Sequence, residues 1–161
     1  MEKTDRAGRA GCSCRTSCPE QCPGERPCTA FASFFIFEKR FENGAPIPWV
    51  TGVADPTGSI VLTNDEQIDL LPGYYYISYS VATVLEEAGY LQVTPSVNGT
   101  PYLFYGAYFK ESAGSSSATG ANTFILHLPA PASLRLTCNS SVANRAGAAT
   151  LSVLKLAPAA L

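Results

Sequence analysis

The sequence is poor in the side chains that enzymes use for acid–base and nucleophilic chemistry. It has a single histidine, His127, and only 15% charged residues. Neither a Gly-x-Ser-x-Gly nor a His-Glu-x-x-His motif occurs in it, and these motifs mark two widespread classes of hydrolase. We therefore expect no enzymatic activity, with His127 serving as a packing or hydrogen-bonding residue.

Runs of one charge sign and long apolar runs are also missing. The chain has 11 Lys and Arg against 13 Asp and Glu, with a net charge of -2 and no basic cluster, which excludes the electrostatic footprint of nucleic-acid binding. No stretch approaches the ~20 apolar residues that span a bilayer, and the first residues lack the apolar middle of a secretory signal. The sequence predicts no nucleic-acid partner, no membrane span, no cofactor, and synthesis in a cytoplasm without Sec export.

Cysteine, in contrast, is concentrated in one short segment. The stretch "GCSCRTSCPEQCPGERPC", from Gly11 to Cys28, holds five of the six cysteines. The first 28 residues have almost no aliphatic side chains, so they cannot form a hydrophobic core. From Thr29 onward aromatic and β-branched residues appear in runs. These changes in composition predict a cysteine-rich N-terminal arm, residues 1–28, followed by one domain, residues 29–161.

The pattern of the cluster favours covalent links between chains over a metal site. Its spacing lacks the two close pairs that structural zinc sites use, and Pro19 and Pro23 oppose a helix through it. Five cysteines cannot all pair within the arm, so one stays free, bonds to Cys138 or crosses to another chain. By its parity with Leu134 and Leu136, Cys138 is expected to be a small core residue, although its place near a strand end leaves exposure open. We predict no metal and intermolecular disulfides, with these candidates: Cys12, Cys14, Cys18, Cys22, Cys28 and Cys138. A zinc site and a flexible tail with indiscriminate oxidation are the alternatives.

The domain has the pattern of an all-β protein. Short runs rich in aromatic and β-branched residues alternate with Gly, Pro, Asn and Ser clusters, and no segment has a convincing helical period. Nine strands at near-regular spacing indicate a β-sandwich or jelly roll, with a barrel as the alternative. The strands are expected at Thr29–Phe37, Trp49–Val53, Ser59–Thr63, Gly73–Thr83, Tyr90–Asn98, Tyr102–Lys110, Asn122–Leu128, Ser133–Asn139 and Ala149–Leu156.

Four of these strands are apolar on both faces, namely the first, the strand from Gly73, the strand from Asn122 and the last. A two-layer sandwich buries one face of each sheet, so a second apolar face needs a cover of its own. The simplest cover is another copy of the chain, although scattered surface apolar residues are the alternative. The residues predicted for the subunit interface are Phe34, Ile36, Tyr74, Tyr76, Ile125, His127, Leu154 and Leu156.

A series of motifs in residues 29–157 resembles a known family. The stretches "LPGYYYISYSVA", "LQVTPSVNGTP", "HLPAPASLRLTCNSS" and "AATLSVLKL", in this order, are similar to the C-terminal domain of BclA-like exosporium proteins of spore-forming Firmicutes. The resemblance implies a C1q/TNF-like jelly roll that forms a tight homotrimer. It also implies that the first, long middle, penultimate-but-one and last strands share the inner sheet near the three-fold axis.

The chain departs from this family in one respect, because the arm lacks the glycine at every third position of a collagen-like stalk. We expect a structural protein of the bacterial spore surface, in the exosporium, coat or an appendage. It would self-assemble into a trimer or fibre, be cross-linked by the arm cysteines and contact other coat or exosporium proteins. Synthesis in the mother-cell cytoplasm, with oxidation after lysis, would reconcile the cysteines with the missing signal. The alternative function is a carbohydrate- or receptor-binding module, for which Tyr102, Tyr105 and Tyr108 could form a platform.

Overall fold

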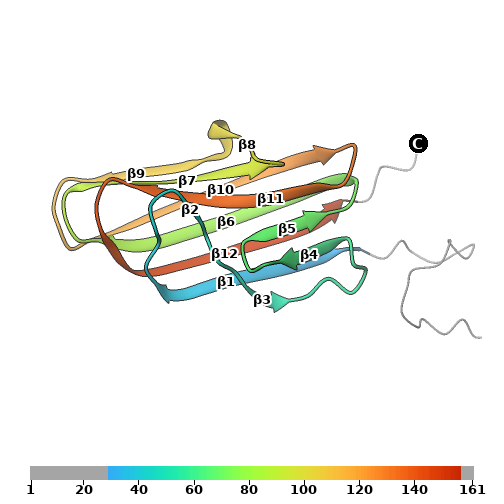
Figure 1. Cartoon of the computed structure of the whole chain (residues 1–161), viewed down its shortest axis with the longest axis horizontal. Coiled ribbons are helices and arrows are strands. Elements are labelled where there is room, and N and C mark those ends of the chain that lie inside the picture. Colours follow the sequence, from blue (N-terminus) through green and yellow to red (C-terminus); the bar gives the residue numbers. More distant parts are fainter. Residues whose placement is uncertain (1–28, 157–161) are drawn as a thin grey trace, which may run out of the picture.

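The computed structural model describes residues 29–156, which form two antiparallel sheets packed face to face (Figure 1). The predicted arm, with its five cysteines, lies outside the described residues. No helix in the described range is long and apolar enough to cross a membrane. The elements are β1 (Phe31–Lys39), β2 (Ala45–Pro46), β3 (Val50–Val53), β4 (Ile60–Thr63), β5 (Gln67–Leu70), β6 (Gly73–Leu85), β7 (Gly89–Val97), β8 (Thr100–Pro101), the 3-10 turn η1 (Leu103–Tyr105), β9 (Ala107–Glu111), β10 (Ser116–Leu128), β11 (Ala132–Ser140) and β12 (Asn144–Leu156).

The two sheets differ in strand order and in the lengths of their strands. The five-stranded sheet has the order β10-β6-β12-β1-β3, and the seven-stranded sheet has the order β4-β5-β11-β7-β8, with β2 paired to β11 and β9 paired to β7. The four strands that the sequence shows to be apolar on both faces, β1, β6, β10 and β12, are neighbours in the five-stranded sheet. The predicted sandwich and the predicted common sheet of these strands are both confirmed.

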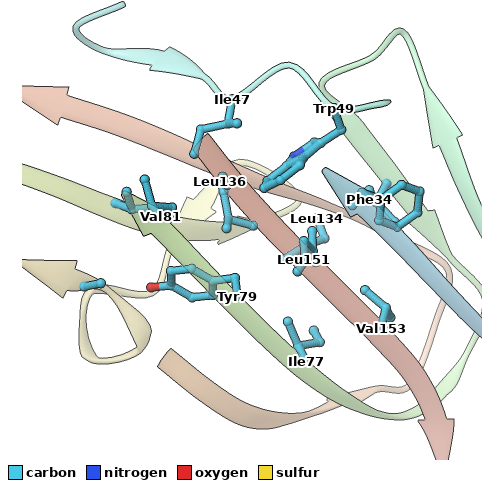
Figure 2. Packing of buried hydrophobic residues seen from close by; sticks show 14 of the residues in the cluster. Phe34, Ile47, Trp49, Ile77, Tyr79, Val81, Leu134, Leu136, Leu151 and Val153 are labelled. Carbon is cyan, nitrogen blue, oxygen red and sulfur yellow. The ribbon is translucent and has the colours of Figure 1, made fainter. Parts of the chain in front are cut away.

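The core fills the space between the sheets with aliphatic and aromatic side chains from both (Figure 2). Ile77, Tyr79 and Leu151 of the five-stranded sheet lie in one cluster with Leu134 and Leu136 of the seven-stranded sheet. Each side chain of this size contributes ~1.5–3 kcal/mol when it is removed from water. This burial fixes which face of each strand points inward, because a shift of one residue would expose the whole set.

The burial pattern of β1 corrects one sequence prediction. Phe34 and Ile36 were expected at the subunit interface, but both side chains are buried in the core. Phe34 is 3% exposed and points into the core cluster (Figure 2). The reason is the register with β12, in which Phe34 lies opposite the buried Leu151 and Ile36 opposite the buried Ala149. Phe35, which is 42% exposed, lies on the outer surface instead. The outer face of β1 is therefore the opposite one from that predicted.

Strand β10 corrects a second prediction, since it begins at Ser116 and not at Asn122. The segment from Ser116 to Ala121 is rich in Ser, Gly and Ala and lies outside the strands that the sequence predicted. It instead pairs residue by residue with β6, from Ser116 opposite Leu85 to Leu128 opposite Gly73. Backbone hydrogen bonds to a neighbouring strand outweigh the low β-propensity of small residues here.

Candidate self-association face

The outer surface of the five-stranded sheet carries large apolar side chains at the end where β1 begins and β12 ends. The register places Ile125 of β10, Tyr76 of β6, Leu154 of β12 and Phe31 of β1 side by side across four strands. All four are exposed. Directly opposite residues on one face of a sheet lie close enough for their side chains to contact. They therefore form a continuous apolar row across the sheet.

A second row borders the first at the end of the sheet. His127 lies opposite Tyr74, and Tyr74 lies opposite Leu156. The rings of His127 and Tyr74 stack with their centroids 4.3 Å apart. Stacked aromatic rings keep a fixed orientation at little cost in side-chain entropy. This end of the face therefore presents a preformed aromatic surface.

Small and hydroxyl-bearing residues cover the middle of the same surface. One row holds Thr123, Ser78, Ser152 and Ser33, and the next holds Ala121, Ser80, Thr150 and Phe35. A third pair, Ala82 opposite Ala148, continues the surface. Thr123 donates a hydrogen bond from its hydroxyl to the hydroxyl of Ser78, at 3.0 Å. Apart from Phe35, these side chains are short, so another protein surface can approach the sheet closely here.

None of the residues in these rows is Asp, Glu, Lys or Arg, although the chain has 11 basic and 13 acidic residues. We call this surface, made by the rows from His127 to Ala148, the uncharged face. Depletion of charge together with enrichment in aromatic residues characterises the core of protein–protein interfaces. Contiguous exposed apolar patches are also uncommon on monomeric proteins. The face has the chemistry of a surface that packs against protein.

The uncharged face contains six of the eight residues that the sequence assigned to an interface, namely Tyr74, Tyr76, Ile125, His127, Leu154 and Leu156. The sequence interpretation missed Phe31, Phe35 and Phe37, which are exposed on β1. A signal for them was present. These phenylalanines share one face of the strand with the polar Ser33, whereas the other face holds only the apolar Ala32, Phe34 and Ile36. The face that is wholly apolar is the one expected in the core.

Cys138 lies in β11 with its side chain in the core, where it is 1% exposed. It is opposite Val93 on one side and Ala45 on the other. Burial raises the pKa of its thiol to about 12, because the apolar surroundings disfavour the thiolate. The structure therefore places Cys138 as the small core residue that its parity predicted, without the exposure that a disulfide to another chain needs. The other disulfide candidates lie outside the described residues.

The tyrosines considered for a sugar platform belong to two separate aromatic groups. Tyr102 and Tyr105 stack on each other with centroids 6.1 Å apart, and Tyr105 stacks on Phe124 at 4.1 Å. Tyr108 instead stacks on Tyr90, at 5.5 Å. The first group closes the edge of the sandwich and the second lies on the seven-stranded sheet. The three side chains consequently do not form a common platform.

Comparison with solved structures shows the fold of the described domain. A scan against protein-family models finds no match, and a search of curated proteins finds none. The globular domain of zebrafish complement 1qA protein matches 80% of this chain and 98% of its own, at 12% identity and a TM-score of 0.59. An Eiger TNF structure from S. frugiperda matches 83% and 96%, at 13% identity and a TM-score of 0.63. The vertex protein P5 of PRD1 matches 80% and 97%, at 13% identity and a TM-score of 0.55.

The described domain is an all-β sandwich with the C1q/TNF-like jelly-roll fold. These identities are low, so the likeness concerns the fold. In this fold the uncharged face occupies the outer surface of the sheet that contains the first and last strands.

Proposed function

We propose that this protein is a structural protein that self-assembles into a homotrimer through the uncharged face. The observation that carries the proposal is the unbroken apolar row of Ile125, Tyr76, Leu154 and Phe31 across four strands, with no charged residue in the neighbouring rows. Burying this row against other copies removes large apolar side chains from water. The number three rests on the resemblance to BclA-like domains and not on the row itself.

The position of the row favours covalent cross-linking of the assembly by the arm. Phe31 and Leu154 lie at the end of the sandwich where the described chain begins (Figure 1). When copies pack through this face, their described chains begin near one another at Thr29, the residue to which the arm is joined. Such tethering raises the effective concentration of reacting groups without any new contact. Cys12, Cys14, Cys18, Cys22 and Cys28 are the residues proposed to form disulfides between chains, whereas Cys138 remains a core residue.

The proposed location is the surface of a bacterial spore, as part of the exosporium, coat or an appendage. The support is the ordered set of sequence motifs, together with a jelly-roll fold of the same class as the BclA-like domain. Other coat or exosporium proteins would then be the partners that the arm cysteines attach. Detection of the protein by antibody on intact spores, and its loss after reduction and washing, is the expected result.

Gel electrophoresis of the full chain with and without reductant tests the cross-linking. The wild-type chain should form a ladder of oligomers without reductant and a single 17.0 kDa band with it. Replacing Cys12, Cys14, Cys18, Cys22 and Cys28 by Ser should abolish the ladder while the domain stays folded. A Cys138→Ser variant is the matched control and should keep the ladder. A monomer in both lanes for the wild-type chain would contradict covalent assembly.

A further inference from the structure

A short turn at the edge of the sandwich holds two large apolar side chains in solvent. Leu103 is 67% exposed and Phe104 is 73% exposed, both within η1. This segment follows β8 and stands out from the body of the domain (Figure 1). We call Leu103–Gly106 the edge turn. Single exposed apolar residues are common, but two adjacent ones on a projecting turn are typical of a contact surface.

The edge turn is held rigidly by aromatic stacking and hydrogen bonds. Phe104 packs edge-on against Tyr105 with centroids 4.5 Å apart, and Tyr105 stacks on Phe124. The hydroxyl of Tyr79 donates to the Tyr105 carbonyl at 2.7 Å, and its oxygen points out of the core cluster (Figure 2). A Cβ at Gly106 would approach the Leu103 carbonyl oxygen to 3.0 Å, so the close packing of the turn favours glycine there. A side chain held in place before binding loses little entropy on binding.

The uncharged face has a matching hollow of about 510 Å³. Phe35 and Phe37 of β1 form one wall, and Ser80, Ala82, Ala148 and Thr150 form the floor. The floor is low because these four residues are small, while the two phenylalanines stand above it. We call this depression the β1 hollow. It is uncharged and continues the proposed association surface toward the far end of β1.

The edge turn cannot reach the β1 hollow of its own chain. The turn packs on Phe124, which points between the sheets from the edge strand β10, and the Asn122 side chain donates to the Gly106 carbonyl at 3.3 Å. The hollow lies on the outside of the same sheet, over β6, β12 and β1. A contact between the turn and the hollow therefore requires two copies of the chain.

The turn and the hollow lie within a few residues of each other along the strands. Tyr79 binds the Tyr105 carbonyl, and the ring of Tyr105 stacks on Phe124, which is opposite Ile77. The floor of the hollow extends along β6 from Ser80 to Ala82. With a rise of about 3.3 Å per strand residue, the offset is roughly 3–17 Å.

We propose that the edge turn of each copy inserts Leu103 and Phe104 into the β1 hollow of the next copy. This inference rests on the proposed self-association and names the two surfaces that meet in it. The occupant is a second copy of this chain, because both surfaces are uncharged and both adjoin the same apolar rows. Phe104 then acts as a rigid aromatic anchor, the kind of residue that dominates interface energetics.

A double-mutant cycle on Phe104 and Ala148 tests the contact. Phe104→Ala removes the anchor and should weaken association by at least about 30-fold. Ala148→Leu fills the floor of the hollow and should weaken it about tenfold. The double variant should associate as strongly as Phe104→Ala alone. Without the Phe104 ring no large side chain enters the hollow, so filling the hollow with Leu has no further effect. Sedimentation velocity over a series of concentrations measures all four proteins, and near-UV circular dichroism checks that each is folded.

Tyr108→Ala is the matched control, since Tyr108 is another exposed aromatic residue, at 60%, but lies on the seven-stranded sheet. It should leave association unchanged. If the effects of Phe104→Ala and Ala148→Leu multiply within a factor of two while the wild-type chain still associates, the edge-turn contact is wrong and self-association stands. A wild-type chain that stays monomeric would overturn both proposals.

Discussion

The outer surfaces of the two sheets are built from antiparallel strands of similar pairing, yet their side chains differ in kind. The seven-stranded sheet carries Gln67, Asp69, Gln92, Arg135 and Asn139 outward. Several of these side chains are joined by hydrogen bonds, such as that from Arg135 to Gln67 at 2.7 Å. The uncharged face of the other sheet has one hydrogen bond between hydroxyls and otherwise aromatic, aliphatic and small side chains.

This difference between the outer surfaces indicates which of the two sheets is suited to face solvent. An antiparallel sheet with one face on the core usually presents alternating polar residues on its other face. The seven-stranded sheet follows this rule, so solvent is a sufficient environment for it. The five-stranded sheet departs from the rule over four adjacent strands, so solvent alone does not account for its outer residues. The proposed self-association through that sheet does account for them.

The largest expected effect comes from adding a charge to the centre of the apolar row. Tyr76→Glu should convert the assembly to monomers, because an unpaired carboxylate buried at a subunit contact costs several kcal/mol. Tyr108→Glu makes the same chemical change on the seven-stranded sheet and should leave the assembly intact. Sedimentation velocity in reductant measures both. If the two variants had the same association state, the two sheets would not differ in their role in assembly.

The next largest effect separates the two faces of β1. In the monomeric Tyr76→Glu background, Phe34→Ala should lower the free energy of unfolding by about 3–5 kcal/mol, as for other buried phenylalanines. Phe35→Ala should change it by no more than about 0.5 kcal/mol, because its side chain points outward. Urea denaturation followed by tryptophan fluorescence gives both values. Similar losses for the two variants would show that the inward face of β1 has been assigned incorrectly.

Cys138 should be protected from modification, in contrast to the predicted reactivity of the arm cysteines. In the chain with the five arm cysteines changed to Ser, Cys138 should not react with a maleimide near neutral pH until the protein is unfolded. The reason is the burial of its thiol, which also raises its pKa to about 12. Mass spectrometry after labelling measures the reaction. Rapid labelling of the native chain would contradict the core position.

The same burial predicts a loss of stability at alkaline pH. Burial raises the pKa of Tyr75 and Tyr79 to about 12 as well. From about pH 9 to pH 12 the unfolded chain releases protons from these groups while the folded chain keeps them, so the free energy of unfolding falls as pH rises. Urea midpoints measured across this range should therefore decrease. A constant midpoint would contradict the burial of these groups.

The smallest expected effect is that of salt. Because the rows of the uncharged face hold no Asp, Glu, Lys or Arg, raising sodium chloride from about 0.05 M to 0.5 M should change the association constant less than about twofold. Analytical ultracentrifugation at both salt concentrations is sufficient. A decrease of tenfold or more would indicate that charged residues elsewhere hold the copies together.

The sequence predicted the fold class and the composition of the exposed sheet because both depend on local patterns. Alternation in Ser133–Asn139 shows one wet face, and the tyrosines of β6 show apolar residues on both parities. The Asn-Gly pair in "VNGT" favours a hairpin turn, and in the structure Asn98 and Gly99 are both at positive φ between β7 and β8. These features follow from neighbours in the chain, so no tertiary information is needed to find them.

Other features could not be predicted, because partners distant in the chain determine them. The register between β1 and β12, which are more than 100 residues apart in the chain, is one such feature. The same holds for Asn144, which is buried and hydrogen-bonds the backbone of Phe41 through both its amide atoms. Its sequence context, "NRAGA", favours a turn and not the strand that it begins. The edge turn and the β1 hollow likewise come from tertiary packing.

The mass of the full-length wild-type chain in solution with reductant present tests the central claim most directly. Reductant removes any disulfide, so the remaining association depends on surfaces such as the uncharged face alone. Packing of three copies through this face predicts a discrete species of about 51 kDa, three times the chain mass of 17.0 kDa. A single species of about 17 kDa at micromolar concentration, with the domain folded, would contradict it.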